Sequence, residues 1–195
     1  MQQNSLTRRT VLTGAATAAF VPVTAIRTAA QTAVPARALT PEQRKTVEML
    51  VDRIIPADEV GPGALELGAA NYIDVQMAGY LAPQKAAFLA GVEAVDTYAK
   101  ETHGARFAEL TPEQRDGVLT YISGEQAPPN LRGFFNQVRT YTMQGTFGDP
   151  HYGGNIGGKG WDLIRYPGPR PATSLEMQRM DKPAEPYRRS AWGKE

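Results

Sequence analysis

Residues 145–169 constrain the fold of this chain more than any other stretch. They read GTFGDPHYGGNIGGKGWDLIRYPGP, and eight of these 25 residues are glycine and three are proline. Helices and strands rarely contain so much glycine, because each one costs conformational entropy on folding. A flexible linker would have no use for the four large rings, which favour burial: Phe147, Tyr152, Trp161 and Tyr166. The stretch therefore predicts a structured loop, and loops of this length in compact domains are usually functional.

A nucleotide-binding interpretation of this loop fails. Gly153, Gly158 and Lys159 match the G-x-x-x-x-G-K part of a P-loop, but Gly160 follows where magnesium binding needs Ser or Thr. A P-loop also joins a strand to a helix whose N-terminus faces the phosphate, whereas the segment upstream has a helical pattern. An Ω-like loop that closes over the core of its own chain remains an open alternative to an interaction site.

Composition limits the class of protein. The 195 residues are enough for one domain with a hydrophobic core, and the hydrophobic fraction of 42% is typical of a globular chain. The net charge of the whole chain is +1, and residues 1–30 carry three arginines and no acid, so the rest carries −2. This balance gives no electrostatic reason to expect nucleic-acid binding. Because cysteine is absent, a thiol nucleophile, a disulfide framework, a cysteine-ligated iron–sulfur cluster and a CxxCH haem attachment are excluded.

Residues 1–38 have the pattern of an export signal and linker. Arg8 and Arg9 precede the uncharged stretch Val11–Ile26, which is shorter than the roughly 20 apolar residues of a membrane-spanning helix. This is a signal-peptide arrangement, and the paired arginines indicate the twin-arginine type. We expect the chain to be exported to the periplasm, with cleavage after Ala25, Ala30 or Ala38. Twin-arginine export carries folded proteins, often with a cofactor, yet nothing in this chain looks able to hold one.

Residues 39–147 are predicted to form an all-α bundle of about five helices. The sequence LTPEQR occurs twice, at residues 39–44 and 110–115, and each copy is a capping box with proline at the first helical position. We expect the second helix to begin near Ala64, and the third to begin at Pro83 and end before Gly104. No stretch alternates like a strand. The residues expected to face the core are Val47, Leu50, Val51 and Ile54; Leu65, Ala69, Ile73, Met77 and Tyr80; Phe88, Val92, Val95 and Ala99; Val118, Leu119 and Ile122; and Leu131, Phe134, Phe135, Val138 and Tyr141.

Residues 148–195 are predicted to form the glycine-rich loop and an extended, proline-rich tail that binds a partner. One helical turn is expected around Leu175–Met180. The tail alone cannot bury enough apolar area to offset its ordering entropy. Tyr187 and Trp192 favour ordering by a partner, since aromatic side chains are enriched at interfaces. A flexible tail is the alternative.

A search for catalytic patterns finds none that is complete. His103 precedes a glycine that is expected to end a helix, where a cationic side chain suits the helix dipole, and His151 alone makes no metal site. Neither Ser123 nor Ser174 lies in a G-x-S-x-G motif. Four carboxylates could cluster around the first two helices, although such acids are usually solvated or capping: Asp52, Asp58, Glu59 and Asp74.

Two stretches together resemble the gluconate 2-dehydrogenase subunit 3 family. They are RIIPADEVGPGALELGAANYID at residues 53–74 and GDPHYGGNIGGKGWDLIRYPGP at residues 148–169, and the resemblance covers most of the chain after the leader. The matching positions are Pro62, Gly63, Asp74, Asp149, Pro150, Tyr152, Gly153, Gly154, Asn155, Gly160 and Trp161.

The resemblance implies a non-catalytic small subunit of an exported, membrane-associated FAD-dependent dehydrogenase of the sugar, polyol or sugar-acid type. FAD would belong to a large flavoprotein subunit and haem c to a multihaem cytochrome c subunit, with no cofactor and no catalytic or metal-binding residue in this chain. The small subunit would stabilise the flavoprotein and, with Arg8 and Arg9, escort it through the twin-arginine pathway, and it would contact the membrane only through the complex. We expect the partner interface to include Asp149, Tyr152, Asn155, Trp161, Tyr166, Tyr187 and Trp192.

Two alternatives from other classes remain. One is a free-standing periplasmic helical enzyme whose glycine-rich loop forms the active site. The other is a periplasmic ligand-binding module that uses the same loop. Turnover or bound flavin in the isolated chain would favour the enzyme, and a stable chain without a large partner would favour the binding module.

Overall fold

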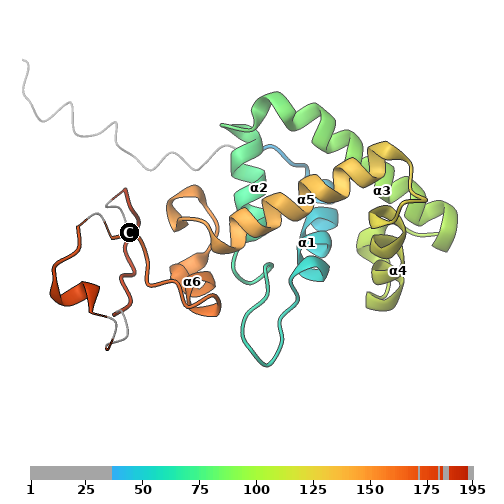
Figure 1. Cartoon of the computed structure of the whole chain (residues 1–195). Helices are drawn as coiled ribbons and strands as arrows, with labels where there is room; N and C mark the ends of the chain where they lie inside the picture. The colour runs from blue at the N-terminus through green and yellow to red at the C-terminus, as the bar shows by residue number, and fades with distance from the viewer. Residues whose placement is uncertain (1–36, 171, 180, 182–184, 193–195) are drawn as a thin grey trace, which may run out of the picture. The chain divides into compact units, whose positions relative to one another are not determined.

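The computed structural model describes residues 37–170, 172–179, 181 and 185–192, so the predicted export signal with Arg8 and Arg9 lies outside the described residues. The described residues form helices and contain no strand, as predicted for an all-α fold (Figure 1). The α-helices are α1 (Pro41–Ile54), α2 (Ala69–Ala78), α3 (Lys85–His103), α4 (Pro112–Ser123), α5 (Pro129–Phe147) and α6 (Lys159–Leu163). The 3₁₀ turns are Ala82–Gln84, Phe107–Glu109, Pro150–Tyr152, Ile156–Gly158 and Glu176–Gln178.

Helix α5 is the central element of the helical core, because α1, α2, α3, α4 and α6 all contact it (Figure 1). Its apolar stripe buries Phe134, Val138 and Tyr141. Phe88 of α3 meets two of these rings, with centroid separations of 5.4 Å to Phe134 and 6.0 Å to Tyr141. Such tilted aromatic pairs add to the free energy gained from burial. The 3.6-residue periodicity of the sequence predicted this apolar face, whereas the central position of α5 is known only from the structure.

Both predicted capping boxes are present. The Thr40 side chain accepts a hydrogen bond from the Gln43 backbone N–H, and the Gln43 side chain accepts one from the Thr40 N–H. Thr111 and Gln114 repeat the arrangement at the start of α4. These bonds satisfy backbone donors that a helix N-terminus otherwise leaves without partners. The repeated LTPEQR sequence thus marks two helix starts, as expected.

The second helix differs from the prediction. It begins at Ala69 and not near Ala64, because Gly68 has a left-handed backbone with φ of +81° through which an α-helix cannot continue. Residues before Gly68 form turns, in which Leu65 is half-buried. Tyr80, predicted to face the core, lies beyond the end of α2 at Gly79 and is 86% exposed. Ile54 and Phe135 are also only half-buried, whereas the other predicted core residues are buried.

Asp96 of α3 is a buried carboxylate that joins three elements. It is 1% exposed, and it accepts hydrogen bonds from the Thr46 hydroxyl of α1 at 3.2 Å and from the Phe107 backbone N–H at 3.1 Å. Arg106 donates to the same carboxylate through Nη2 at 2.6 Å and Nε at 3.1 Å. A buried charge is tolerated when it is paired and hydrogen-bonded in this way. Asp96 therefore fixes α1, α3 and the turn that precedes α4.

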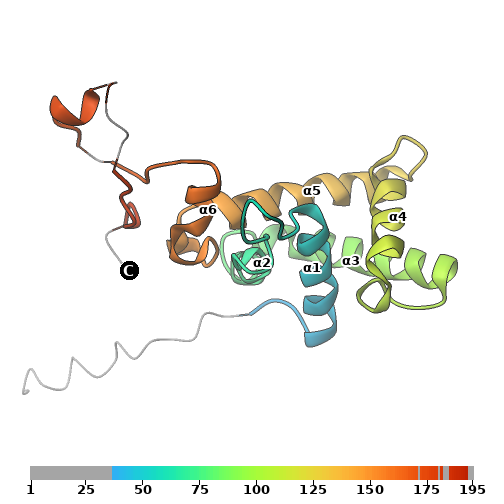
Figure 2. The same cartoon turned by 90° about the horizontal axis from the view of Figure 1, so that it is seen from below.

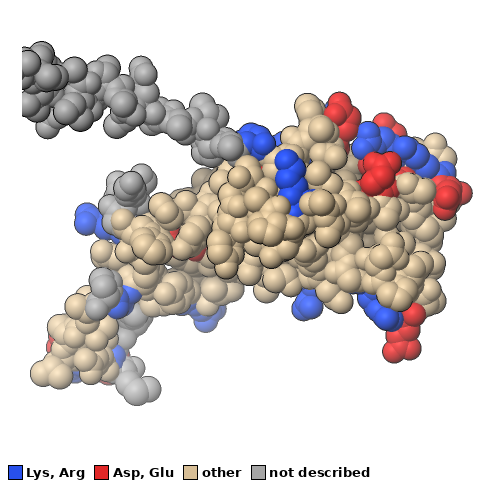
Figure 3. Space-filling model, turned by 90° about the horizontal axis from the view of Figure 1, so that it is seen from above, with Lys and Arg blue, Asp and Glu red and all other residues tan. Residues whose placement is uncertain are grey.

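The charged side chains do not form a patch of one sign on the face shown in Figure 3. Acidic and basic side chains lie interspersed there, mainly toward α3, and much of the remaining surface is uncharged. This distribution agrees with the sequence-based expectation that charge gives no reason for nucleic-acid binding. Among the described residues, no helix has both the length and the hydropathy to cross a membrane.

Candidate interaction site

Asn155 is the residue on which the glycine-rich loop is built. It is fully buried and has a left-handed backbone with φ of +43°, which asparagine tolerates better than most residues. Its side-chain Nδ2 donates to the Gly148 carbonyl at 2.7 Å, and its Oδ1 accepts from the Gly160 N–H at 2.7 Å. Its own backbone N–H donates to the Gly145 carbonyl at 2.7 Å. One amide side chain thus joins the end of α5 to the start of α6, where Figure 2 shows the two helices side by side.

Trp161 of α6 packs against the same end of α5. It is 2% exposed, and its indole Nε1 donates to the Phe147 carbonyl at 2.9 Å. The ring of Tyr166 meets it edge to face with centroids 5.6 Å apart. A Cβ at Gly160 would collide with the Thr146 carbonyl oxygen, and a Cβ at Gly154 with that of Gly145. Glycine at these two positions is what allows the loop backbone to approach the last turn of α5.

Helix α2 holds the other side of the loop. Asn71 donates through Nδ2 to the Gly153 carbonyl at 2.5 Å, and Gln76 donates through Nε2 to the Tyr152 carbonyl at 3.1 Å. The Ile156 N–H adds a bond of 3.1 Å to the Leu67 carbonyl. Sequence reasoning missed Asn71 and Gln76, because polar residues outside the apolar stripe carry no periodic signal. The loop is therefore fixed from two sides by the chain's own helices.

The C-terminal segment returns to this loop. The Tyr187 N–H donates to the Pro167 carbonyl at 2.5 Å, and Arg188 donates to the Gly158 carbonyl at 3.3 Å and pairs with Asp162. Farther along, the Ala191 N–H donates to Asp149 Oδ2 at 2.8 Å. The described part of the tail is thus attached to the loop over residues 187–191.

Asp149 is the acceptor at the centre of this attachment. Besides Ala191 it accepts from the His151 N–H at 2.9 Å, and the hydroxyl of the buried Ser190 hydrogen-bonds to it. Partial burial by itself raises the pKa of Asp149, but these hydrogen bonds and the nearby His151 together lower the pKa below its ordinary value. Asp149 is therefore held as a carboxylate that accepts hydrogen bonds and orders the tail.

Exposed rings gather where the tail meets the loop. His151 lies between Tyr152 and Trp192, with centroid separations of 5.3 Å and 5.7 Å, and the rings of Tyr152 and Trp192 are 6.5 Å apart. Tyr152 is 40% exposed and Trp192 is 61% exposed. We call these three residues the exposed aromatic cluster. Aromatic residues are enriched at protein–protein interfaces, and exposed apolar patches often mark such interfaces.

The seven residues predicted to contact a partner fall into three groups. Asn155 and Trp161 are buried in the chain itself, so their side chains hold the loop and do not present themselves to another protein. Asp149 is half-buried and orders the tail. Tyr152, Tyr166, Tyr187 and Trp192 are exposed, so their contact with a partner stays a prediction.

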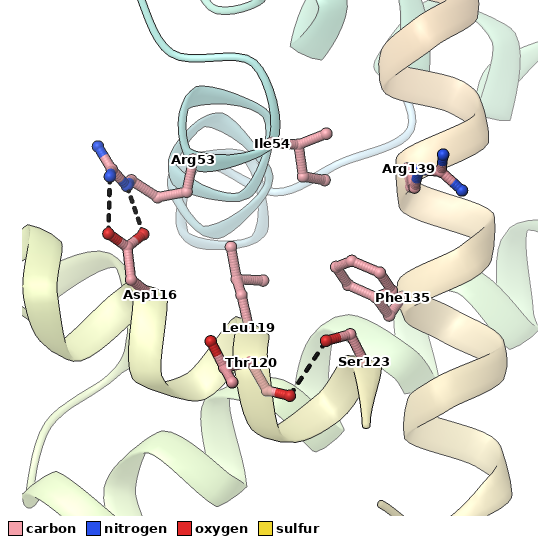
Figure 4. A pocket seen from close by; sticks show the side chains of 8 residues that line it. All are labelled: Arg53, Ile54, Asp116, Leu119, Thr120, Ser123, Phe135 and Arg139. Carbon is pink, nitrogen blue, oxygen red and sulfur yellow. Dashed lines mark hydrogen bonds and ion pairs between the residues drawn. The ribbon is translucent and has the colours of Figure 1, made fainter. Parts of the chain in front are cut away.

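A pocket lies elsewhere, between α1, α4 and α5. It encloses about 340 Å³, and Figure 4 shows Arg53 and Asp116 paired on one side with Phe135 and Arg139 of α5 opposite. Arg53 donates through Nε and Nη2 to the two Asp116 oxygens at 2.7 and 2.8 Å, and this pairing lowers the pKa of Asp116. Ser123 donates its hydroxyl to the Thr120 carbonyl at 3.0 Å. The lining contains no histidine, and its one carboxylate, Asp116, is paired with Arg53, so the lining offers no free base to activate the serine. Ile54 and Leu119 complete the lining.

The other residues considered for chemistry have structural environments. His103 is the last residue of α3 before Gly104, which has a left-handed φ of +77°, as predicted. Asp58 accepts from the Val60 N–H within a turn, and Asp74 is paired with Arg44. Of the four carboxylates considered around the first two helices, Asp74 is buried whereas Asp58 and Glu59 are exposed, so the four do not share one environment. Within the described residues, no three His, Asp or Glu side chains are arranged to hold a metal ion.

The comparisons with known proteins identify one family. The family model described as gluconate 2-dehydrogenase subunit 3 matches residues 41–168, which run from the start of α1 through the glycine-rich loop. No curated protein and no solved structure matches the chain. The matched range includes Asn155, Gly160 and Trp161, so the residues that build the loop lie inside the family region.

Proposed function

The chain belongs to the gluconate 2-dehydrogenase subunit 3 family, and on this premise we propose that it is the non-catalytic small subunit of an exported FAD-dependent dehydrogenase complex. In this proposal the large flavoprotein subunit holds FAD and carries out the oxidation of a sugar, polyol or sugar acid. A multihaem cytochrome c subunit accepts the electrons. The small subunit stabilises the flavoprotein in the periplasm and reaches the membrane only through the complex.

The observation that carries the proposal is that the loop has buried side chains that hold its shape and exposed side chains that are free to contact another protein. The buried side chains of Asn155 and Trp161 are used entirely in joining α5 to α6. The exposed aromatic cluster of His151, Tyr152 and Trp192 stands on this base and has no covering element among the described residues. A rigid base that presents exposed rings supports binding to a protein surface, because such rings bury a large area at a small entropy cost.

Escort through the export pathway is the second part of the proposal. Arg8 and Arg9 supply a twin-arginine signal, and the flavoprotein is exported as a folded, FAD-loaded passenger bound to this chain. The need for a cofactor-loaded passenger explains why a small chain without an evident cofactor site carries a signal of this type.

Co-purification tests the subunit assignment. The chain is expressed with the flavoprotein encoded beside it, and the pair is compared with a chain carrying Tyr152→Ala and Trp192→Ala. Loss of hot-spot rings costs about 2 kcal/mol or more of binding, which is roughly a 30-fold weaker association. Tyr80→Ala is the matched control, since Tyr80 is 86% exposed and is not part of the exposed aromatic cluster.

The outcomes separate the alternatives. The proposal predicts a yellow complex, a colourless isolated chain, and loss of the complex in the double variant only. A yellow isolated chain with dehydrogenase turnover would contradict the proposal and favour the free-standing enzyme. Equal co-purification of all variants would place the interface outside the exposed aromatic cluster.

A further inference from the structure

Asp74 of α2 is a buried carboxylate that binds the beginning of the described chain. It is 2% exposed. Its Oδ1 accepts from the backbone N–H groups of Ala38 at 2.7 Å and Leu39 at 3.0 Å. Its Oδ2 accepts from Arg44 Nη1 at 2.9 Å and from Arg37 Nη1 at 3.5 Å. Among the described residues, every donor to this carboxylate thus comes from residues 37–44.

Neighbouring contacts extend the attachment. Asn71, one turn earlier on α2, accepts a hydrogen bond from Arg37 and also donates to the Gly153 carbonyl of the loop. Ala38 and Leu39 pack against the hydrophobic core, and the capped start of α1 follows at Thr40. Residues 37–39 are therefore part of the folded unit. A buried carboxylate that lost these donors would be left with an unmet desolvation cost.

The attachment of residues 37–39 to α2 affects which peptide bond a signal peptidase can cleave. Ala36-Arg37-Ala38 is an A-x-A pattern of the kind that precedes a signal-peptidase cleavage site, so the sequence offers the bond between Ala38 and Leu39. Cleavage hydrolyses one peptide bond: water supplies the hydroxyl to the new carboxyl group of the leader and hydrogen to the new amine. The protease must first hold the chain in an extended form around that bond. A segment docked on α2 is open to it only after local unfolding.

We propose that docking on Asp74 protects the Ala38–Leu39 bond, so that the leader is cut upstream, after Ala25 or Ala30, and the mature chain keeps Arg37. This inference rests on the proposed export, in which the chain reaches the protease already folded. Cleavage after Ala38 would remove the Arg37 guanidinium and the Ala38 N–H from Asp74. Only Arg44 and the new amine of Leu39 would then remain beside the buried carboxylate.

The mature N-terminus is the first test. Intact-mass measurement and N-terminal sequencing of the periplasmic chain are expected to show a first residue of Ile26 or Gln31. A mature chain that begins at Leu39 would overturn the inference. A chain that stays in the cytoplasm with its leader intact counts against the export proposal, and the docking is then decided by the second test.

Limited proteolysis of the purified full-length chain tests the docking without export. Trypsin cleaves after arginine, so cleavage of the Arg37–Ala38 bond reports release of the segment. We expect Asp74→Asn to accelerate this cut by about tenfold or more, since the variant removes the negative charge to which the donors of residues 37–44 bind. Asp96→Asn is the matched control, because Asp96 is equally buried and arginine-paired but does not touch residues 37–39.

A second variant keeps the test valid where Asp74→Asn does not fold. Leu39→Pro removes one N–H donor to Asp74 together with the Leu39 side chain that packs on the core, and it leaves the Arg37–Ala38 bond unchanged. It is expected to accelerate the cut at Arg37 while the circular dichroism stays that of the wild type. Wild-type cleavage at Arg37 as fast as in these variants, or equal acceleration by Asp96→Asn, would overturn the inference.

Discussion

Trp161 occupies the junction between α6 and the last turn of α5, where its indole N–H donates to the Phe147 carbonyl. The same ring packs edge to face on Tyr166. Because the side chain is almost fully covered by its own chain, its energetic contribution belongs to folding of the loop. Trp192, the other tryptophan, is largely exposed and belongs to the exposed aromatic cluster.

The two tryptophans therefore differ in what their loss does to stability. We expect Trp161→Ala to cost about 3–5 kcal/mol, as for other buried large-to-small substitutions, and to lower the melting temperature by roughly 10 °C. Trp192→Ala is the control and is expected to change the free energy of unfolding by less than about 0.5 kcal/mol. Thermal unfolding of the isolated chain, followed by circular dichroism, measures both. Equal melting temperatures would contradict the assignment of Trp161 to the loop.

Asp149 gives the tail attachment a pH dependence. Its pKa is lowered below the ordinary value of 3.8, so its stabilising effect is fully present above pH 3.8 and is lost as the pH falls through the lowered pKa. Fluorescence of Trp192 in a Trp161→Phe background is expected to report release of the tail in that acidic range. Asp149→Asn is expected to remove this transition. A transition that persists in Asp149→Asn would assign the pH dependence to another group.

At the scale of elements, α5 contains two glycines with opposite roles. Gly145 faces α2, and a Cβ there would lie 2.8 Å from Ala69 Cα and 2.9 Å from Tyr72 Cβ. Gly133 is exposed on the same helix, and a Cβ there would meet no atom within 4 Å. Close approach of α2 to α5 thus depends on the first glycine and not on the second.

Alanine at these positions is expected to change stability in opposite directions. Gly133→Ala should stabilise the chain by about 0.5–1 kcal/mol, because alanine loses less conformational entropy in a helix. Gly145→Ala should destabilise it by roughly 1–3 kcal/mol, since α2 must shift to admit the methyl group. Urea unfolding of both variants gives the comparison. Stabilisation by Gly145→Ala would show that the packing of α2 on α5 is looser than the contacts indicate.

The sequence predicted elements better than contacts between them. The capping boxes at Thr40 and Thr111 and the stripe of α5 are local signals, and each appears in the structure. The start of α2 was missed because it depends on the left-handed backbone of Gly68, which a glycine in a sequence permits but does not require.

The sequence predicted where the candidate site lies, but not which of its side chains are buried and which are exposed. Glycines among aromatic residues indicated a structured loop, but nothing local shows that Trp161 is covered while Tyr152 stays exposed. That outcome depends on long-range contacts with α2 and α5, such as those of Asn71 and the Phe147 carbonyl. The return of Ala191 to Asp149 is likewise a contact between distant residues that no periodicity reports.

For the whole molecule, family membership and structure support one account. The family region extends from α1 through the loop, and the segment after it returns to that loop and adds Trp192 to the exposed aromatic cluster. Residues 1–36 supply the paired arginines. In the proposed account, the folded unit binds the flavoprotein and the leader directs the pair across the membrane, so the function of this chain is exercised on another subunit.

Localisation of dehydrogenase activity tests this account most directly. Cells that express the flavoprotein are prepared in four forms: with the wild-type chain, without the chain, with the double variant Arg8→Lys and Arg9→Lys, and with Arg27→Lys. Arg27→Lys controls for an arginine-to-lysine change in the leader outside the pair. The account predicts that flavoprotein and activity are periplasmic with the wild-type chain and Arg27→Lys. It predicts that both are lost from the periplasm in the double variant and in cells without the chain. Undiminished periplasmic activity in those two strains would contradict the account.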